Sequence, residues 1–322
     1  MIRQALKSIH TRILKVLLVA SCLFVRCAQE VFIDLPEQET KIVVVSHFTT
    51  GQTFKVKVSL SQQVYDSGNP VVPEKVDITL AKEGAFIDKL FKATSDDGQI
   101  YWESRDLAEP GVVYSVNARI DGMPQASASS AIPAFYPLAP VSIDPEKISR
   151  TPLSDGRMLL NVPLELHLDQ LPPDKRYFAF GLKHDVDVLQ NVNGEWVTDF
   201  TYEGLSTNYS ADGRTLSLLY DLSEPVVLIN EKFWSENQGQ GGNTLYLDAR
   251  IPYNPAENEK PRRLYVEWRT LSEEFYKYHL SIARQGSNLP LSDPDAVFNN
   301  VENGYGNFSG YSVAVDTLEL PF

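Results

Sequence analysis

The sequence predicts a mainly β protein built from two antiparallel β-domains. Beyond residue 40 the apolar residues alternate with polar ones at a period of two. The alternating runs are short and rich in β-branched residues, and Asp-Gly or Asn-Gly turns separate them. A chain of 322 residues, 43% of them hydrophobic, can bury a core in each of two domains. We expect an immunoglobulin-like or transthyretin-like sandwich over 41–140 and a larger β-domain with one helix over 141–322.

Residues 1–27 have the features of a secretory signal that ends in a lipid anchor. Basic residues and no acidic ones surround an apolar run over 16–25, which is too short to span a bilayer. Small residues precede Cys22, as a lipoprotein signal peptidase requires, and Cys27 competes because an acidic, proline-containing stretch typical of the start of a tether follows it. We therefore expect cleavage and lipidation at Cys22 or Cys27, with a plain secretory signal as the alternative. The protein would then be held at the outer membrane by its lipid.

The charge balance argues against a general role in binding nucleic acid. The chain has 29 Lys and Arg against 42 Asp and Glu, a net charge of −13. Since the leader 1–27 carries +5, the remaining residues carry −18 (−13 − 5), and such a surface repels a phosphate backbone. Two cysteines are too few for a disulfide framework. The acidic part begins with a tether that we place at 28–40.

The strands of the first domain follow from its alternating runs. We predict them at Ile42–Val45, Phe54–Leu60, Val76–Leu80, Gln99–Glu103 and Val112–Ile120. The Asp97-Gly98 and Asp121-Gly122 pairs suit tight turns, because both residue types tolerate positive φ angles. A last strand over 126–130 leads into a proline-rich stretch that is typical of an extended linker, so we place the domain boundary near residue 140.

The second domain is predicted in the same way. Its strands are expected at 159–168, 177–182, 215–220, 244–250 and 263–269, with turns at Asp155-Gly156, Asn193-Gly194 and Asp212-Gly213. A glycine-rich segment over 299–311 is predicted to be a loop that leads into a closing strand over 312–318.

One segment follows the helical period instead, and we predict a helix near 271–285. Thr270 and Glu273 have the spacing of a capping box, and Gly286 suits a left-handed helix end. The face expected to pack against the second β-domain consists of Leu271, Phe275, Tyr278 and Ile282.

No spacing in the chain predicts catalysis, a metal or a cofactor. The five histidines stand singly, without the pairs of a zinc site. Asp185 and Asp187 share one face of a strand and could contact calcium, but the rest of a calcium loop is missing, so we expect a solvated face. The usual nucleophile motifs are also absent. We expect a protein that is not an enzyme.

Aromatic residues are the one feature that suggests ligand binding. Trp102, Trp196, Trp234 and Trp268 could line a platform for a glycan or peptide, although half-buried β surfaces also use Trp and Tyr. Trp234 precedes a polar, glycine-rich stretch over 235–243, and Tyr305 lies in the glycine-rich segment. We predict these two as ligand-binding residues for a small molecule, glycan or peptide.

The chain resembles a lipoprotein family of the Bacteroidota, the domain of unknown function 4249. The resemblance rests on an anchor cysteine followed by Ile33-Asp34-Leu35-Pro36 and the strand from Lys41, and above all on the aromatic helix with the Asn-x-x-x-Gly-x-Gly-x-Phe-x-Gly pattern over 300–310. In the family the cysteine usually stands at the place of Cys27, but the neighbouring Arg26 is a poor cleavage site. The resemblance implies a lipoprotein that is often encoded beside a TonB-dependent, SusC-like receptor, and it supplies no catalytic residues.

These observations together predict a non-enzymatic accessory or ligand-binding partner of a TonB-dependent receptor in nutrient uptake. Two other classes of protein stay open. An extracellular glycan or peptide hydrolase would need a pair of carboxyl groups with shifted pKa values in a cleft. A structural or adhesive surface module would present no pocket.

Overall fold

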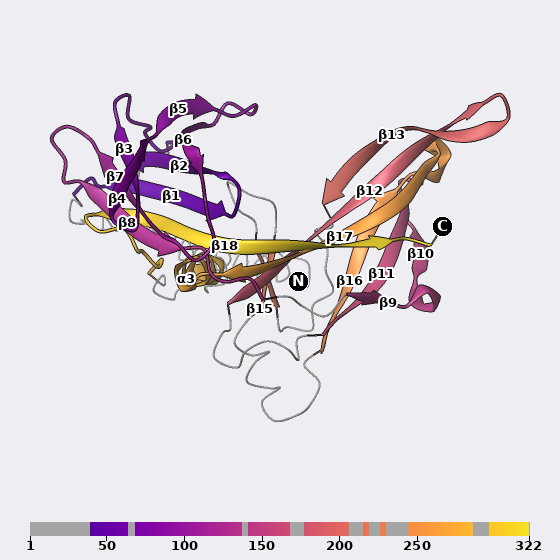
Figure 1. Ribbon diagram of the computed structural model, residues 1–322. Helices are drawn as coiled ribbons and strands as arrows, with labels where there is room; N and C mark the ends of the chain where they lie inside the picture. The colour runs from indigo at the N-terminus through magenta and orange to yellow at the C-terminus, as the bar shows by residue number, and fades with distance from the viewer. Residues whose placement is uncertain are drawn as a thin grey trace, which may run out of the picture. The chain divides into compact units, whose positions relative to one another are not determined.

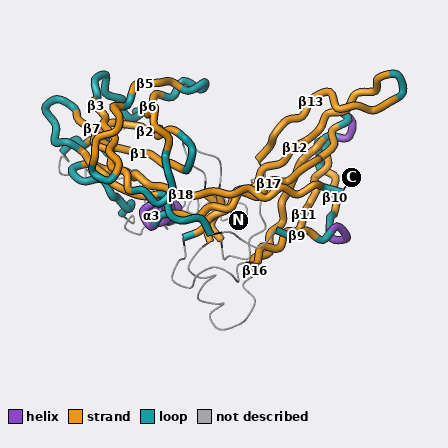
Figure 2. Tube along the Cα trace, in the orientation of Figure 1, coloured by secondary structure: helices purple, strands orange, loops and turns teal. Residues whose placement is uncertain are grey.

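The structure is a computed structural model that describes residues 39–63, 68–136, 141–167, 177–205, 215–218, 226–229, 244–285 and 296–321 (Figure 1). Strands make up most of these residues, together with one α-helix and two short 3-10 turns (Figure 2). The predicted mainly β class is therefore confirmed. Both candidate lipidation sites, Cys22 and Cys27, lie outside the described residues, as does Trp234. No helix among the described residues is long and apolar enough to cross a membrane.

The first region folds into two sheets that enclose one core. Its strands are β1 (Ile42–Thr49), β2 (Thr53–Leu60), β3 (Asp77–Lys82), β4 (Ala85–Lys89), β5 (Phe91–Thr94), β6 (Ile100–Leu107), β7 (Val113–Arg119) and β8 (Ala126–Ala131). One sheet has the order β4-β3-β7-β8, and β1-β2-β6-β5 form the end of a ten-stranded sheet. Aromatic side chains fill the space between them, with the Phe48 and Phe308 rings 4.6 Å apart and the Phe54 and Tyr114 rings 4.7 Å apart. This arrangement is a β-sandwich, as the sequence predicted.

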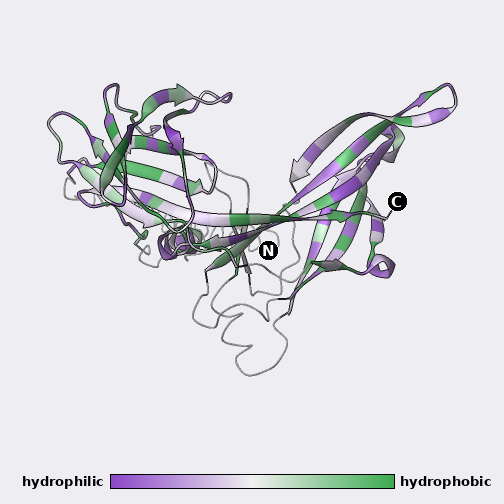
Figure 3. Cartoon of the chain, viewed as in Figure 1, coloured by the Kyte–Doolittle hydropathy of each residue, from purple (hydrophilic) through white to green (hydrophobic). Residues whose placement is uncertain are grey.

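The second region adds the remaining strands. They are β9 (Ser142–Ile143), β10 (Ser149–Pro152), β11 (Met158–His167), β12 (Phe178–Val192), β13 (Glu195–Leu205), β14 (Thr215–Leu218), β15 (Val226–Ile229), β16 (Thr244–Tyr253), β17 (Glu259–Leu271) and β18 (Gly304–Glu319), with 3-10 turns η1 (Pro145–Lys147) and η2 (Pro255–Glu257). Strands β10-β11-β16, with β9 beside β11, form a four-stranded sheet. Alternate residues of β11 are buried, and Figure 3 shows apolar and polar residues alternating along the strands.

The ten-stranded sheet joins strands from both regions through β18. Its order is β14-β15-β12-β17-β18-β1-β2-β6-β5, with β13 paired to β12. Strand β18 runs parallel to β1 from Gly304 to Tyr311 and antiparallel to β17 from Tyr311 to Glu319 (Figure 1). The parallel pair was not expected from the sequence. The boundary near residue 140 falls on residues 137–140, which are not described, and it stays a prediction.

The glycine-rich segment forms the first half of β18, so the prediction of a loop over 299–311 is wrong from Gly304 onward. The glycines are needed because neighbouring backbones lie very close. A Cβ atom on Gly306 would lie 2.0 Å from the Val44 carbonyl oxygen, and one on Gly310 would lie 2.5 Å from that of Ala131. The Asn300 side chain bonds both backbone groups of Phe308 in this strand: its Nδ2 donates to the Phe308 carbonyl, and its Oδ1 accepts from the Phe308 amide. The most specific part of the sequence pattern thus has a structural role.

The predicted helix is confirmed as α3 (Glu273–Gln285), but its cap and its packing face differ from the prediction. Strand β17 continues through Leu271, so Ser272 caps the helix in place of Thr270, with its Oγ accepting from the Phe275 amide at 3.3 Å. The buried side chains are Phe275, Tyr276 and His279, whereas Ile282 is 40% exposed. The prediction holds for Leu271 and Phe275, which pack with Ala179 and Leu228, but it is wrong for Ile282, because Tyr276 and His279 face the sheet instead.

Candidate functional site

The aromatic candidates do not form a platform in the described part of the chain. Trp102 and Trp268 are buried in the two cores, whereas Trp196 on β13 is 59% exposed. Tyr305 is 41% exposed at the start of β18, with the Lys41 ammonium 5.2 Å from its ring centroid. Tyr305 does not line the recess described below, and Trp234 lies outside the described residues, so both stay predictions as ligand-binding residues.

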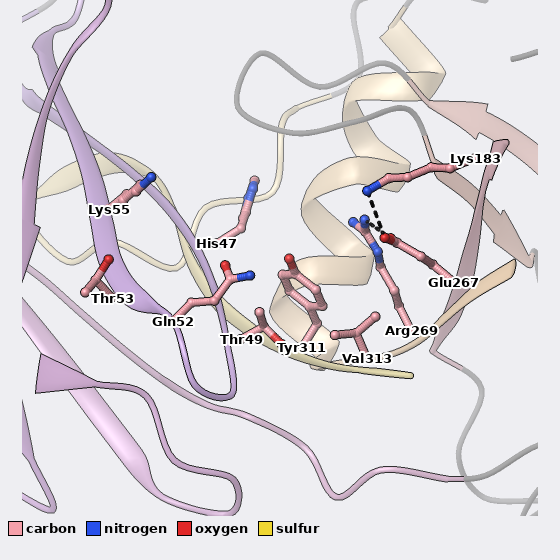
Figure 4. A pocket seen from close by; sticks show the side chains of 10 residues that line it. All are labelled: His47, Thr49, Gln52, Thr53, Lys55, Lys183, Glu267, Arg269, Tyr311 and Val313. Carbon is pink, nitrogen blue, oxygen red and sulfur yellow. Dashed lines mark hydrogen bonds and ion pairs between the residues drawn. The ribbon is translucent and has the colours of Figure 1, made fainter. Parts of the chain in front are cut away.

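A polar recess of about 360 Å³ lies on the ten-stranded sheet (Figure 4). Five neighbouring strands of the sheet, in the order β12-β17-β18-β1-β2, supply its walls. The residues that line it are His47, Thr49, Gln52, Thr53, Lys55, Lys183, Glu267, Arg269, Tyr311 and Val313. Register places them on one face, because Thr49 pairs with Tyr311 across β1 and β18, and Arg269 pairs with Val313 across β17 and β18. The opposite face of β1 carries Phe48 into the sandwich core.

Glu267, the one carboxylate among the described residues that line the recess, is held between two cations. Glu267 Oε2 accepts a hydrogen bond from Arg269 Nη2 at 2.7 Å, and its Oε1 lies 3.1 Å from Lys183 Nζ (Figure 4). Burial alone would raise the pKa of Glu267, but the charge of Arg269 and the hydrogen bonds from Arg269 and Lys183 outweigh it and lower the pKa below its ordinary value. Glu267 therefore stays ionised at neutral pH.

Arg269 is the most deeply placed cation of the site. It is only 4% exposed, and its guanidinium carbon lies 5.0 Å from the Tyr311 ring centroid, a distance suited to a cation–π contact. The ion pair with Glu267 and the Tyr311 ring together fix the plane of the guanidinium.

Two histidines meet where α3 packs beside the recess. The Nε2 atoms of His47 and His279 lie 3.3 Å apart, and the His47 ring centroid is 4.9 Å from that of Phe275. Burial lowers the pKa of His47 to about 4; a hydrogen bond with Asn307 acts in the opposite direction, and the charges of Arg269 and Lys57 lower the pKa further. Burial likewise lowers the pKa of His279, and the neighbouring Arg269 and any proton on His47 lower it further. Both imidazoles are neutral at pH 7.

Acid is expected to destabilise the protein through His47. Its pKa is lowered in the folded chain, so as pH falls below the ordinary value of 6.5 the unfolded chain binds the proton first. The contribution of His47 is complete above pH 6.5 and is lost progressively down to about 4. A shift of this size corresponds to about 3 kcal/mol. Urea titrations at pH 7.5 and pH 4.5 should show a smaller loss of stability in His47→Gln than in the unaltered chain. An equal loss in both would contradict the assignment.

The two aspartates of β12 lie in different surroundings. The Asp185 side chain is buried and accepts a hydrogen bond from the Tyr265 hydroxyl. Asp187 accepts one from Thr201 at 2.6 Å. The expectation of a solvated face was wrong for Asp185, since the register shift between Asp185 and Val186 interrupts the alternation of β12. Across the described ranges, no cluster of three or more His, Cys, Asp or Glu residues could hold a metal ion.

Sequence reasoning did not find the recess. No two of its cations are neighbours in the sequence, because Lys55, Lys183 and Arg269 come from three strands that only the sheet order brings together. One signal was present in the sequence: polar residues alternate with apolar ones along β2, and they mark a face that does not join the sandwich core.

Comparison with protein families gives one finding for the chain. The family model described as Domain of unknown function (DUF4249) matches residues 28–317. No match was found among curated proteins.

Proposed function

Given that the chain belongs to the DUF4249 family, we propose that it is a membrane-anchored, non-enzymatic lipoprotein that binds a ligand as the accessory partner of a TonB-dependent receptor in nutrient uptake. The observation that carries this proposal is the polar recess, whose one carboxylate is tied to Lys183 and Arg269. Five strands of a single sheet build it, and a rigid, preformed recess with a few charged groups suits ligand capture.

The arrangement of Glu267 supports binding over hydrolysis. A glycosidase uses two carboxyl groups, and the general acid among them needs a raised pKa. In the part of the chain that the structure describes, Glu267 is the one carboxylate that lines the recess, and its pKa is lowered. A group in that state holds cations in place and does not donate a proton at neutral pH.

The leader supports the membrane part of the proposal. Its basic start, short apolar run and two candidate cysteines fit a lipoprotein signal, and a lipid on Cys22 or Cys27 would tie the β-domains to the membrane by the tether 28–40. The receptor partner is proposed from the resemblance stated above.

Affinity purification of the tagged full chain from detergent-solubilised membranes of its native host tests the proposal. We expect a receptor barrel to be recovered in near-equal amount. A variant with both cysteines replaced by serine is the control, and it should leave the membrane fraction and lose the receptor. Repeated recovery of the protein alone, together with turnover of a glycan or peptide, would favour the hydrolase alternative and overturn the proposal.

A further inference from the structure

We propose that the recess binds the oxyanion of its ligand, a carboxylate or phosphate group, between Lys55, Lys183 and Arg269. This inference rests on the proposed ligand-binding function and names the chemical class of the ligand.

The described residues that line the recess have an excess of positive charge. Among the described residues, the lining carries three cations, Lys55, Lys183 and Arg269, against one anion, Glu267. Glu103 lies beside Lys55 in the register of β2 and β6 and accepts a hydrogen bond from Thr53 at 2.6 Å. When Glu103 is counted as a second anion, the charge of these described residues is still positive. The chain from residue 28 onward carries −18 (−13 − 5), and a positive recess within such a surface concentrates anions at one place.

Preorganisation is the second argument. Glu267 and the Tyr311 ring hold the Arg269 guanidinium in one plane before any ligand arrives. A guanidinium whose orientation is already fixed loses little conformational freedom when it binds an oxyanion, and its geometry suits two oxygens of a carboxylate or phosphate. Glu267 compensates part of the positive charge of the recess, which allows Arg269 to be buried.

Neutral groups around the cations provide the third argument. The Thr49 hydroxyl is buried, lines the recess and has no hydrogen-bond partner among the described residues. A buried polar atom in this state costs free energy unless a ligand or water pairs with it. The Gln52 amide lines the same wall, and both groups can bond oxygen atoms of a ligand. The volume of about 360 Å³ fits a compound of metabolite size or the end of a larger chain.

Calorimetric titration of the full chain in detergent tests the inference, with succinate, inorganic phosphate and glucose as separate probes. We expect at least one of the two anions to bind, glucose to bind more weakly or not at all, and added salt to weaken the anion. Succinate and phosphate separate the two sources of an oxyanion. Lys55→Gln should lower the affinity for the anion roughly fivefold, because one charge-assisted contact is lost. The Lys55 side chain is exposed and does not support the core, so the variant should fold. Lys92→Gln, on β5 of the same sheet and outside the recess, is the matched control and should bind as the unaltered chain does.

Each outcome decides the inference. Tighter binding of glucose than of both anions would overturn it, as would equal anion affinity in Lys55→Gln and the unaltered chain. Anion binding without recovery of a receptor would leave the recess assignment standing and remove the proposed partner. Recovery of a receptor without anion binding would leave the proposed partner standing and overturn the oxyanion assignment of the recess.

Discussion

Replacing Gly306 by alanine is expected to lower the free energy of unfolding by about 4 kcal/mol or to prevent folding. Two causes add. The φ angle of Gly306 is +118°, which strains any residue with a side chain. The new Cβ would also lie 2.0 Å from the Val44 carbonyl oxygen, so β18 and β1 would have to move apart. That pair connects the sandwich to the rest of the ten-stranded sheet.

Gly156→Ala is the matched control for this prediction. Gly156 also has a positive φ angle, +89°, but no atom lies within 4 Å of the place its Cβ would occupy. Only the backbone strain remains, and the expected cost is about 1 kcal/mol. Urea denaturation followed by tryptophan fluorescence compares the two variants. Equal losses would show that the close approach of β1 and β18 adds nothing.

Replacing Glu267 by glutamine is expected to cost about 3 kcal/mol, because it leaves the buried Arg269 and its neighbour Lys183 without the anion that compensates them. The pKa of Glu267 is lowered in the folded chain, so its contribution is present above the ordinary glutamate pKa and is lost as pH falls through the lowered value. Denaturation midpoints of the variant and the unaltered chain should therefore differ at pH 7 and converge in acid.

Glu273→Gln provides the control with the same chemical change. Glu273 pairs with Lys277 one turn along α3, and both side chains are about half exposed. Such a pair contributes only a few tenths of a kcal/mol. A loss at Glu267 as small as that at Glu273 would mean that the recess does not depend on its carboxylate.

Much of the fold could be predicted because alternation is a local signal. Strands such as β2, β7 and β11 have one buried face, and their residues alternate accordingly. The short strands β4 and β5 were missed, since they bury few side chains and leave little alternation to detect. The start of β18 was mistaken for a loop because its glycines are usual in loops, whereas here they allow three strands to approach closely.

The recess could not be predicted because it depends on which strands become neighbours. His47 and Arg269 are separated by 222 positions (269 − 47), and they meet because β18 pairs with both β1 and β17. Nothing in the sequence around either residue marks this pairing. The parallel register of β1 and β18 then decides which side chains share a face with Tyr311.

A crystal structure of the chain grown with succinate at a saturating concentration tests the central claim most directly. We expect a carboxylate within hydrogen-bonding distance of the Arg269 guanidinium and the Lys183 ammonium, with Lys55 closing on it from β2. The claim would be contradicted by succinate bound only elsewhere, or by a recess that side chains of the chain itself fill.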